Sequence, residues 1–484
     1  MNTAAESRTW LWLLLALALG LFAIRITGPD DLEDNSQSRN VGYAIDLVDH
    51  GHWLVQRDLQ DRIQSKPPLH TWMIGVLAAP FGLNRLTLTL PSFAAVAGMM
   101  LLVFHIGKMR FGLLAGIVSG FAMIMCPLMW RQMGMVRSDA VFALAIAGGA
   151  WAAFRAWETG KGWTMFWFCA AVSLLAKGPL GILLSSVGLL AWFWERQTHR
   201  PHPGLSGSHR RGLLIFFALC LSWVIPALWL HGGDLVDQMI YRELLGHTVV
   251  PNDHHGNVVM RVLTPTINFL TRFAPFSLFS GAAIIRSFRR PSEHSGERRL
   301  ERFLVCWILA GMMIFTLSAH HRADLLLPLW PAGALLAGFE ASRLAVRVGE
   351  RKFAWAATIA GSLLLAGAWF KYHPLPGRQL RSAAYSQQIR EAAGAFRNTG
   401  IDPHHLHNLS LPATFQYYLG SSEKATTPQR LIEGLKRGEK AWVGTGSLPL
   451  DITAFHGIEV NEAFRWPLAP HQKPVIQIYE VLWP

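Results

Sequence analysis

Four acidic residues follow the first long apolar segment of the chain: Asp30, Asp31, Glu33 and Asp34. Carboxylates grouped in this way could bind a divalent cation or serve as a general base. Their spacing equally suits a solvated acidic cap that helps to fix the orientation of the preceding segment. Both interpretations remain open from the residues alone.

Two lysines stand at turns that interrupt apolar sequence. Lys66 lies in Ser65-Lys66-Pro67-Pro68-Leu69, where the prolines stop one helix and can start the next. A lysine at a helix amino terminus, beside free backbone N–H groups, suits an anionic phosphate. Lys177, in Ala176-Lys177-Gly178-Pro179, is a second candidate anion ligand. For both lysines the alternative is a side chain that merely reaches to the membrane interface.

A third polar cluster, Arg131 with Arg137-Ser138-Asp139, begins another apolar segment. Asp139 could cap the following helix or provide a second carboxylate for the same metal or acceptor, and the spacing favours the cap. Two later loops contain Arg242, Glu243, His247, Asp253, His254 and His255, and then His320, His321, Arg322 and Asp324. Histidine pairs can ligate metals, but neither loop has HExxH or another metal signature.

The composition predicts the class of protein that must position these residues. The 484 residues are 51% hydrophobic and only 15% charged, with a mean hydropathy of +0.26. Soluble globular proteins contain about 25% charged residues, so this chain has too little charge to coat several soluble domains. The sequence has no Walker A motif, no GxGxxG after a strand and no GxSxG, and it therefore does not support a soluble nucleotide-handling fold. An all-α polytopic membrane protein is predicted.

Eleven segments approach the roughly 20 apolar residues that a membrane span needs. They are 10–26, 91–106, 113–129, 139–157, 163–176, 178–194, 213–230, 263–285, 303–319, 325–339 and 353–370. The first is interpreted as an uncleaved anchor, because no clear small-x-small cleavage site precedes Pro29. Pro67–Leu83 is a twelfth apolar stretch, interrupted by Pro80 and Gly82, and we place it on the outer surface as a juxtamembrane or re-entrant helix.

The formal net charge of +13 suits either a nucleic-acid surface or basic cytoplasmic loops. With the amino terminus in the cytoplasm, the segments on that side contain 19 of the 44 basic residues, and all Asp residues fall on the other side or at its edge. The positive-inside rule predicts this asymmetry. If Pro67–Leu83 crossed the membrane, every later loop would invert and the rule would fail. Because the distribution of basic residues is explained by membrane orientation, we expect no nucleic-acid partner.

The composition changes after residue 370. Lys371–Pro484 is polar and has no span-length apolar run. Ser382–Phe396 and Pro428–Arg437 are predicted helices, and Ala441–Val443 and Val475–Val481 are predicted strands. The sequence thus predicts a transmembrane domain over residues 1–370, with a first outer loop and its juxtamembrane helices over 28–90. A small α/β domain over 371–484 is predicted outside the membrane.

Five motifs, taken in order, resemble a known superfamily. They are Gly51-His52-Trp53-Leu54-Val55, Ser65-Lys66-Pro67-Pro68-Leu69-His70-Thr71-Trp72, Arg137-Ser138-Asp139, Ala176-Lys177-Gly178-Pro179 and Leu326-Leu327-Pro328-Leu329-Trp330-Pro331. Their order and spacing over residues 10–340 resemble the aminoarabinose transferase and protein mannosyltransferase superfamily. Its members are polyprenyl-phosphate-sugar-dependent glycosyltransferases of the C fold, and the bacterial lipid-modifying branch also has a periplasmic C-terminal domain.

The resemblance implies roles for individual residues. Lys66 and Asp139 match the family's phosphate-binding lysine and its later acid by position. The family's catalytic Asp-Glu pair does not match, because an ungapped count places Ser36-Gln37 there. Asp34, two residues earlier, is our candidate for the missing carboxylate. Ser65 replaces a glutamate that often precedes the lysine and can bind metal, so a divalent metal on Asp34 and Asp139 stays open.

The resemblance implies a glycosyltransferase of the bacterial inner membrane with a periplasmic active site. Its donor would be a sugar on undecaprenyl phosphate, with the phosphate held by Lys66, Arg137 and Lys177. Asp34 and Asp139 would be the catalytic acids, and the acceptor would be a lipid, a glycan or a protein. Accessory candidates are Asp31, Glu33, Glu243, His254, His255 and Arg322. A flippase for lipid-linked glycans and a non-catalytic divergent member are the alternatives.

Overall fold

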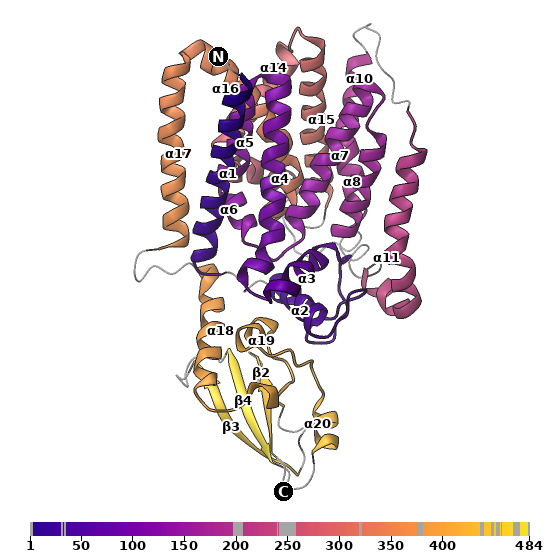
Figure 1. Cartoon of the computed structure of the whole chain (residues 1–484), viewed down its shortest axis with the longest axis vertical. Helices are drawn as coiled ribbons and strands as arrows, with labels where there is room; N and C mark the ends of the chain where they lie inside the picture. The colour runs from indigo at the N-terminus through magenta and orange to yellow at the C-terminus, as the bar shows by residue number, and fades with distance from the viewer. Residues whose placement is uncertain are drawn as a thin grey trace.

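The fold is given by a computed structural model of the chain. It describes residues 3–30, 32, 35–196, 207–239, 241, 258–318, 322–374, 381–435, 440–446, 450, 451, 455, 457–467 and 475–482. A bundle of long helices forms most of the molecule, and a small mixed domain extends from one end of it (Figure 1). We call this end of the bundle the domain end and the end where the N-terminus lies the opposite end.

The helices of the bundle and its loops span residues 3–372. They are α1 (Thr3–Thr27), α2 (Asn35–Asp49), α3 (Leu69–Phe81), α4 (Arg85–Phe111), α5 (Leu113–Met125), α6 (Pro127–Met133), α7 (Asp139–Thr159), α8 (Trp163–Ala176), α9 (Leu180–Ser186), η1 (Val187–Leu190), α10 (Ala191–Arg196), α11 (Arg210–Val236), α13 (Val258–Arg272), α14 (Phe276–Arg289), α15 (Ser295–Leu317), η3 (Ala323–Leu329), α16 (Trp330–Val348) and α17 (Glu350–Tyr372). The prediction of a predominantly α-helical fold is confirmed.

The described residues contain six helices that are long and apolar enough to cross a membrane, or seven if the bent pair α5 and α6 forms one span. The predicted count of eleven spans is therefore not confirmed. Several predicted spans correspond to short or interrupted helices. α8 has only 14 residues, residues 178–194 divide among α9, η1 and α10, and the segment 263–285 is divided between α13 and α14.

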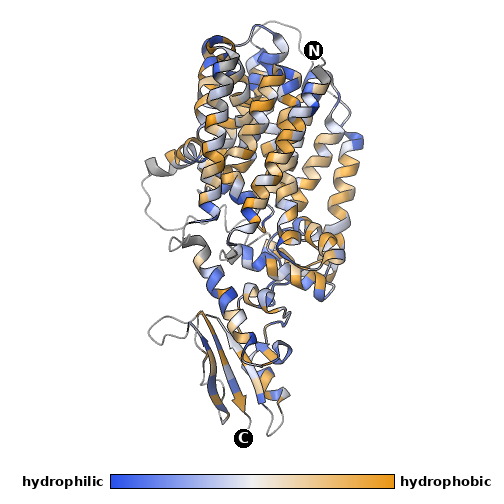
Figure 2. Cartoon of the chain, turned by 60° about the vertical axis from the view of Figure 1, so that its left-hand side comes forward, coloured by the Kyte–Doolittle hydropathy of each residue, from blue (hydrophilic) through white to orange (hydrophobic). Residues whose placement is uncertain are grey.

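The surface of the bundle is apolar where it would face lipid. Trp12, Phe217, Trp229, Leu278 and Leu317 are all more than half exposed. Figure 2 shows hydrophobic residues along the bundle helices and hydrophilic ones at both ends of the bundle and in the C-terminal domain. A soluble protein rarely exposes so large an apolar surface, so the helices are suited to a bilayer.

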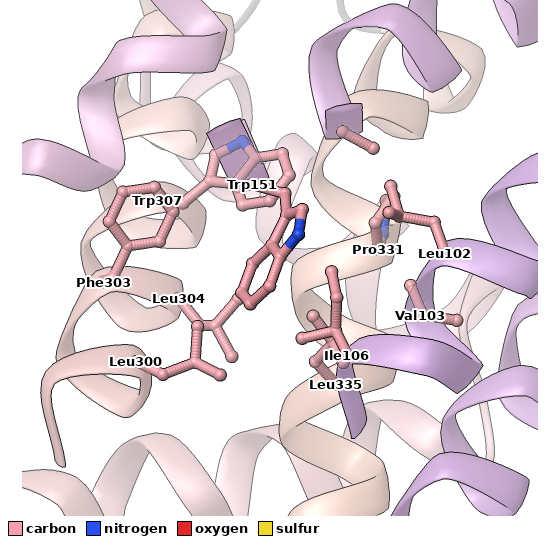
Figure 3. A pocket seen from close by; sticks show the side chains of 11 residues that line it. Leu102, Val103, Ile106, Trp151, Leu300, Phe303, Leu304, Trp307, Pro331 and Leu335 are labelled. Atoms are coloured by element: carbon pink, nitrogen blue, oxygen red, sulfur yellow. The ribbon is translucent and has the colours of Figure 1, made fainter. Parts of the chain in front are cut away.

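The interior of the bundle is closely packed. Gly116 of α5 lies so close to α4 that an added Cβ would stand 2.7 Å from the backbone nitrogen of Lys108. An apolar cavity between α4, α7, α15 and α16, lined by Trp151, Phe303 and Trp307, has a volume of only about 10 Å³ (Figure 3). That volume holds at most about one water molecule, so the interior offers no room for a lipid-linked substrate there.

The C-terminal domain contains helices on both faces of a four-stranded sheet. Its elements are α18 (Arg381–Arg397), η4 (Pro403–His405), β1 (Leu406–Asn408), α19 (Ala413–Leu419), α20 (Pro428–Gly434), β2 (Lys440–Thr445), β3 (Glu459–Trp466) and β4 (Ile476–Leu482). The strand order is β1-β2-β4-β3, with β1 parallel to β2 and the other pairs antiparallel. α18 and α19 pack on one face and α20 on the other, because successive strand residues point to opposite faces.

The secondary structure predicted for this domain is confirmed in α18, α20, β2 and β4, although α20 ends at Gly434 rather than Arg437. β1 and β3 were not predicted. α2 and α3 lie between the bundle and the C-terminal domain (Figure 1). This is where a juxtamembrane helix in Pro67–Leu83 was expected.

Candidate active site

A network of buried charges lies at the domain end of the bundle. Arg137 Nε is 3.0 Å from Asp139 Oδ2, and Arg137 Nη1 donates to Asp324 Oδ2 at 3.1 Å. Lys177 Nζ donates to the other oxygen of Asp139, Oδ1. Arg137, Asp139 and Asp324 are each less than 10% exposed. Buried charges are stable only when they are paired, so these four residues depend on one another.

Three separate elements bring this network together. Asp139 is the first residue of α7, and Lys177 follows the last residue of α8, where Gly178, with a φ of +131°, turns the chain. Asp324 lies in η3. The expectation that Asp139 caps a helix is wrong: the N-cap is Ser138, and it makes no side-chain capping hydrogen bond. The carboxylate of Asp139 is instead paired with two cations, which attract it more strongly than backbone N–H groups.

Lys66 stands at the edge of the same network. It is half-buried in the turn before α3, and its charge acts on both Asp139 and His70. His70 is buried in the first turn of α3, and burial lowers the pKa of its imidazole to about 4. The ring is therefore neutral at pH 7. Its Nε2 makes no hydrogen bond to any described residue, which leaves an unused polar atom beside the lysine.

A cavity of about 430 Å³ adjoins the network and is rich in cations. Arg131, Arg272, Arg322 and Lys371 line it, and Asp324 is the one carboxylate among its described lining residues. Asp324 also accepts a hydrogen bond from Arg322 at 3.4 Å. The described part of the cavity wall thus carries four cations and one carboxylate, a composition that is suited to an anion.

Sequence reasoning missed two of these cations. Arg272 is the last residue of α13 and lies inside the predicted span 263–285. A charged residue inside an apolar segment is itself a signal of function, and this signal was available. Lys371, close to the end of α17, came directly after the last predicted span and gave no comparable signal.

Of the four acids that follow α1, the structure describes only Asp30. Asp30 is buried, and its Oδ2 accepts a hydrogen bond from the Tyr418 hydroxyl at 2.5 Å and another from Arg390. Asp30 thus binds the C-terminal domain and does not face the charge network. Asp31, Glu33 and Asp34 lie outside the described residues, as do Glu243, His254 and His255.

Known proteins match this chain in sequence and in fold. The family model described as "Dolichyl-phosphate-mannose-protein mannosyltransferase" matches residues 65–228. The undecaprenyl phosphate-alpha-4-amino-4-deoxy-L-arabinose arabinosyl transferase of Pseudomonas paraeruginosa is 23% identical over 347 residues, which cover 69% of this chain and 60% of that protein. The transferase of the same description from Erwinia tasmaniensis is 22% identical over 389 residues, which cover 74% of this chain and 67% of that protein.

The solved structure of ArnT from Cupriavidus metallidurans bound to undecaprenyl phosphate superimposes on nearly the whole chain. The TM-score is 0.70 at 15% identity, covering 97% of this chain and 98% of that one. These matches support the resemblance of the chain to the aminoarabinose transferase and protein mannosyltransferase superfamily. The alignment of the chain with the first of these curated relatives spans about 60% of that relative's length.

Ser36 and Gln37 stand where the resemblance implies an Asp-Glu pair, and Gln37 makes a defined structural contact there. Gln37 of α2 is fully buried, and its Oε1 accepts a hydrogen bond from the backbone N–H of Val136 at 3.1 Å. Asn40, one turn later, donates to the carbonyl oxygen of Val136 at 2.7 Å. This part of α2 therefore fixes the first outer loop to the residue directly before Arg137.

The open question of a divalent metal on Asp139 receives an answer from its contacts. Both carboxylate oxygens of Asp139 lie against cations, Lys177 on one side and Arg137 on the other. Such surroundings repel a divalent cation. Across the part of the chain that the structure describes, no group of three or more His, Cys, Asp or Glu side chains could hold a metal ion. Asp139 does not fit the role of a metal ligand.

Proposed function

We propose that the chain is an integral membrane glycosyltransferase that moves a sugar from a polyprenyl-phosphate donor to a lipid, glycan or protein acceptor. The observation that carries the proposal is the cation-rich cavity lined by Arg131, Arg272, Arg322 and Lys371, which adjoins the Arg137 network. An anionic substrate that resides in the bilayer suits this combination of charge and apolar surroundings. The names of the curated relatives, which include undecaprenyl phosphate, support it.

The proposed donor would bind with its polyprenyl tail against the exposed apolar helices and its phosphate at the domain end. Lys66, Arg137 and Lys177, together with the cavity cations, would hold that phosphate. The acceptor oxygen would attack the anomeric carbon while the bond from that carbon to the phosphate oxygen breaks and the electron pair leaves with the phosphate. Cations fixed in place before the reaction stabilise the charge that develops on this leaving group.

The contacts of Asp139 refine the roles first assigned to the acids. Because Asp139 is paired with Lys177 and Arg137, we assign it to holding these cations in position. The proton of the acceptor would pass to another carboxylate, and Asp34 remains our candidate for this general base. Of the first-loop acids, Asp30 is excluded by its contacts with Arg390 and Tyr418.

We also propose the finer topology. Eleven spans, with the N-terminus in the cytoplasm, would place the charge network, the first outer loop and the C-terminal domain in the periplasm of a bacterium. The distribution of basic residues along the sequence supports this orientation. Cysteine accessibility to a membrane-impermeant thiol reagent, with single cysteines introduced at Lys161 and Asp61, would test it: only the second should react from the periplasmic side.

Transfer by the purified chain tests the function. The protein would be given a radiolabelled sugar on undecaprenyl phosphate together with membrane lipid acceptors. Lys66→Ala and Asp34→Asn should each lower transfer at least about a hundredfold, because each removes a charge that the reaction uses. Lys161→Ala and Asp234→Asn are matched controls at exposed positions and should retain full activity.

Other outcomes would point elsewhere. Full transfer by both Lys66→Ala and Asp34→Asn would show that Lys66 does not hold the phosphate and that Asp34 is not the general base. Movement of the intact donor across reconstituted vesicles, without cleavage of the sugar–phosphate bond, would favour a flippase. A folded chain that binds no undecaprenyl phosphate would favour a non-catalytic member of the superfamily.

A further inference from the structure

The C-terminal domain is docked into the first outer loop through a buried contact surface. Ala413, at the start of α19, packs in one hydrophobic cluster with Val41, Ile45 and Leu59 of the loop. On the loop, the strand-like residues Arg57 and Ile63 pair with each other across a tight turn. This hairpin ends only a few residues before Lys66. The C-terminal domain therefore contacts the segment that leads into the proposed phosphate-binding lysine.

Asn408 is the polar centre of this contact surface. Its side chain is fully buried and makes four hydrogen bonds. Nδ2 donates to the carbonyl oxygens of Leu59 at 2.9 Å and Glu423 at 3.1 Å, and Oδ1 accepts from Leu411 N at 2.8 Å and Gln60 Nε2 at 3.3 Å. An amide side chain can use two donors and two acceptor positions, so every one is used, and two bind the tip of the hairpin.

Lys424 forms the second polar contact. Its Nζ is 2.7 Å from Oδ1 of Asp46, whose side chain is fully buried in α2. The same carboxylate accepts hydrogen bonds from the Arg57 backbone N–H at 2.8 Å and from His52. Burial acts to raise the pKa of Asp46, but these hydrogen bonds and Lys424 outweigh it and lower the pKa. The carboxylate is therefore charged at neutral pH, and Lys424 is its ionic partner.

The chain between these contacts and Lys66 has little freedom. Gln64 N donates to Gln56 O at 2.9 Å, which closes the hairpin, and only Ser65 separates Gln64 from Lys66. The other strand of the hairpin is fixed to the bundle, since Trp223 Nε1 of α11 donates to the carbonyl oxygen of Leu54 at 2.9 Å. A displacement of the hairpin would thus be passed directly to the position of Lys66.

We propose that Asn408 and Lys424 are positioning residues for Lys66, so that the C-terminal domain sets the geometry with which the chain holds its lipid-linked donor. The inference rests on the proposed function for its consequence, since Lys66 is the residue that we assign to the donor phosphate. It assigns the C-terminal domain a direct part in donor binding, through hydrogen bonds to the backbone of the first outer loop.

Two variants of the full chain test the inference. Asn408→Asp keeps the acceptor oxygen but removes the N–H donors to Leu59 and Glu423, and Lys424→Ala removes the partner of Asp46. Each should weaken the binding of undecaprenyl phosphate at least tenfold, with kcat at saturating donor reduced much less. Lys424→Arg restores a cation and should recover most of the affinity. The controls are Asn461→Asp and Lys440→Ala, which make the same chemical changes at exposed positions of β3 and β2.

The variants also need a measurement that does not depend on activity. Hydrogen exchange of the backbone amides in residues 54–66 should become faster in Asn408→Asp and Lys424→Ala but not in the two controls. Unchanged exchange, together with unchanged donor affinity in the folded Lys424→Ala protein, would overturn the inference. If the wild-type chain neither binds donor nor transfers sugar, the proposed function fails, while the exchange data still decide whether the C-terminal domain positions this hairpin.

Discussion

Buried ion pairs occur at both ends of the helix bundle, and the pairs at the two ends differ in how acids and cations are matched. At the opposite end, Glu195 pairs with Arg298 and Arg302, and Arg286 pairs with Glu301 and Glu340. Acids and bases match in number in these pairs. At the domain end, Asp139 and Asp324 pair with Arg137, Lys177 and Arg322, and three more cations line the adjoining cavity.

This difference separates a structural role from a functional one. Where acids and bases are equal in number, each charged side chain has a partner of opposite charge and no charge remains to bind a ligand. Among the described residues, the domain end combines more cations than carboxylates with a cavity of about 430 Å³, which gives an anion both charge and room. Burial and shifted pKa values do not by themselves identify a functional site, because charged residues in purely structural ion pairs are also buried and also have shifted pKa values.

The largest expected effect is at the domain end. Asp139→Asn leaves Lys177 and Arg137 buried with only Asp324 nearby, and the freed cations are expected to move. Transfer from the polyprenyl-phosphate donor should fall by about a hundredfold or more, since the cations that face the leaving phosphate lose their fixed positions. Steady-state transfer by the purified variant measures this. Near-normal transfer in a folded Asp139→Asn protein would show that the network is only structural.

The sequence allowed much of this network to be predicted. Arg137, Asp139 and Lys177 stand next to apolar segments, where charged residues are costly, and their positions at helix ends follow from the segment boundaries. Their mutual pairing could not be predicted, because residues 139 and 177 meet only when α7 and α8 pack side by side. For the same reason the favoured interpretation of Asp139 as a helix cap was wrong: it considered the nearest backbone and not the neighbouring helix.

Other features had no signal in the local sequence. The contact between Asn408 and Leu59 joins residues 349 positions apart, and no periodic pattern links two such residues. β3 was missed because half of the residues of Glu459–Trp466 are polar and its pairing is irregular between Glu462 and Phe464. The segment therefore lacks a regular apolar alternation. The span count failed where helices are short or broken, because hydropathy measures the length of an apolar stretch and not its continuity as a helix.

The second prediction concerns the opposite end. Glu195→Gln removes the carboxylate shared by Arg298 and Arg302, and it leaves the buried Arg302 and the partly buried Arg298 without this partner. Breaking a buried pair from one side costs about 3–5 kcal/mol of folding free energy. Thermal unfolding in detergent should therefore show a clear loss of stability, whereas transfer per folded molecule should stay within about twofold of wild type. A comparable loss of transfer would mean that the two ends are not functionally distinct.

The smallest effect should come from a single cation of the cavity. Arg272→Ala removes one of the four cations that line the cavity, and the others remain. Each contact between a charged donor and a phosphate contributes about 1.5–3 kcal/mol, so we expect roughly a tenfold rise in the KM for donor, with little change in kcat. The dependence of KM on salt should also weaken, because one charge no longer contributes.

Arg289→Ala, on an exposed position of the neighbouring α14, is the control. An equal rise in KM from both substitutions would mean that the net positive charge of the chain attracts the donor from a distance. A rise in KM from Arg272→Ala alone would locate the bound anion in the cavity.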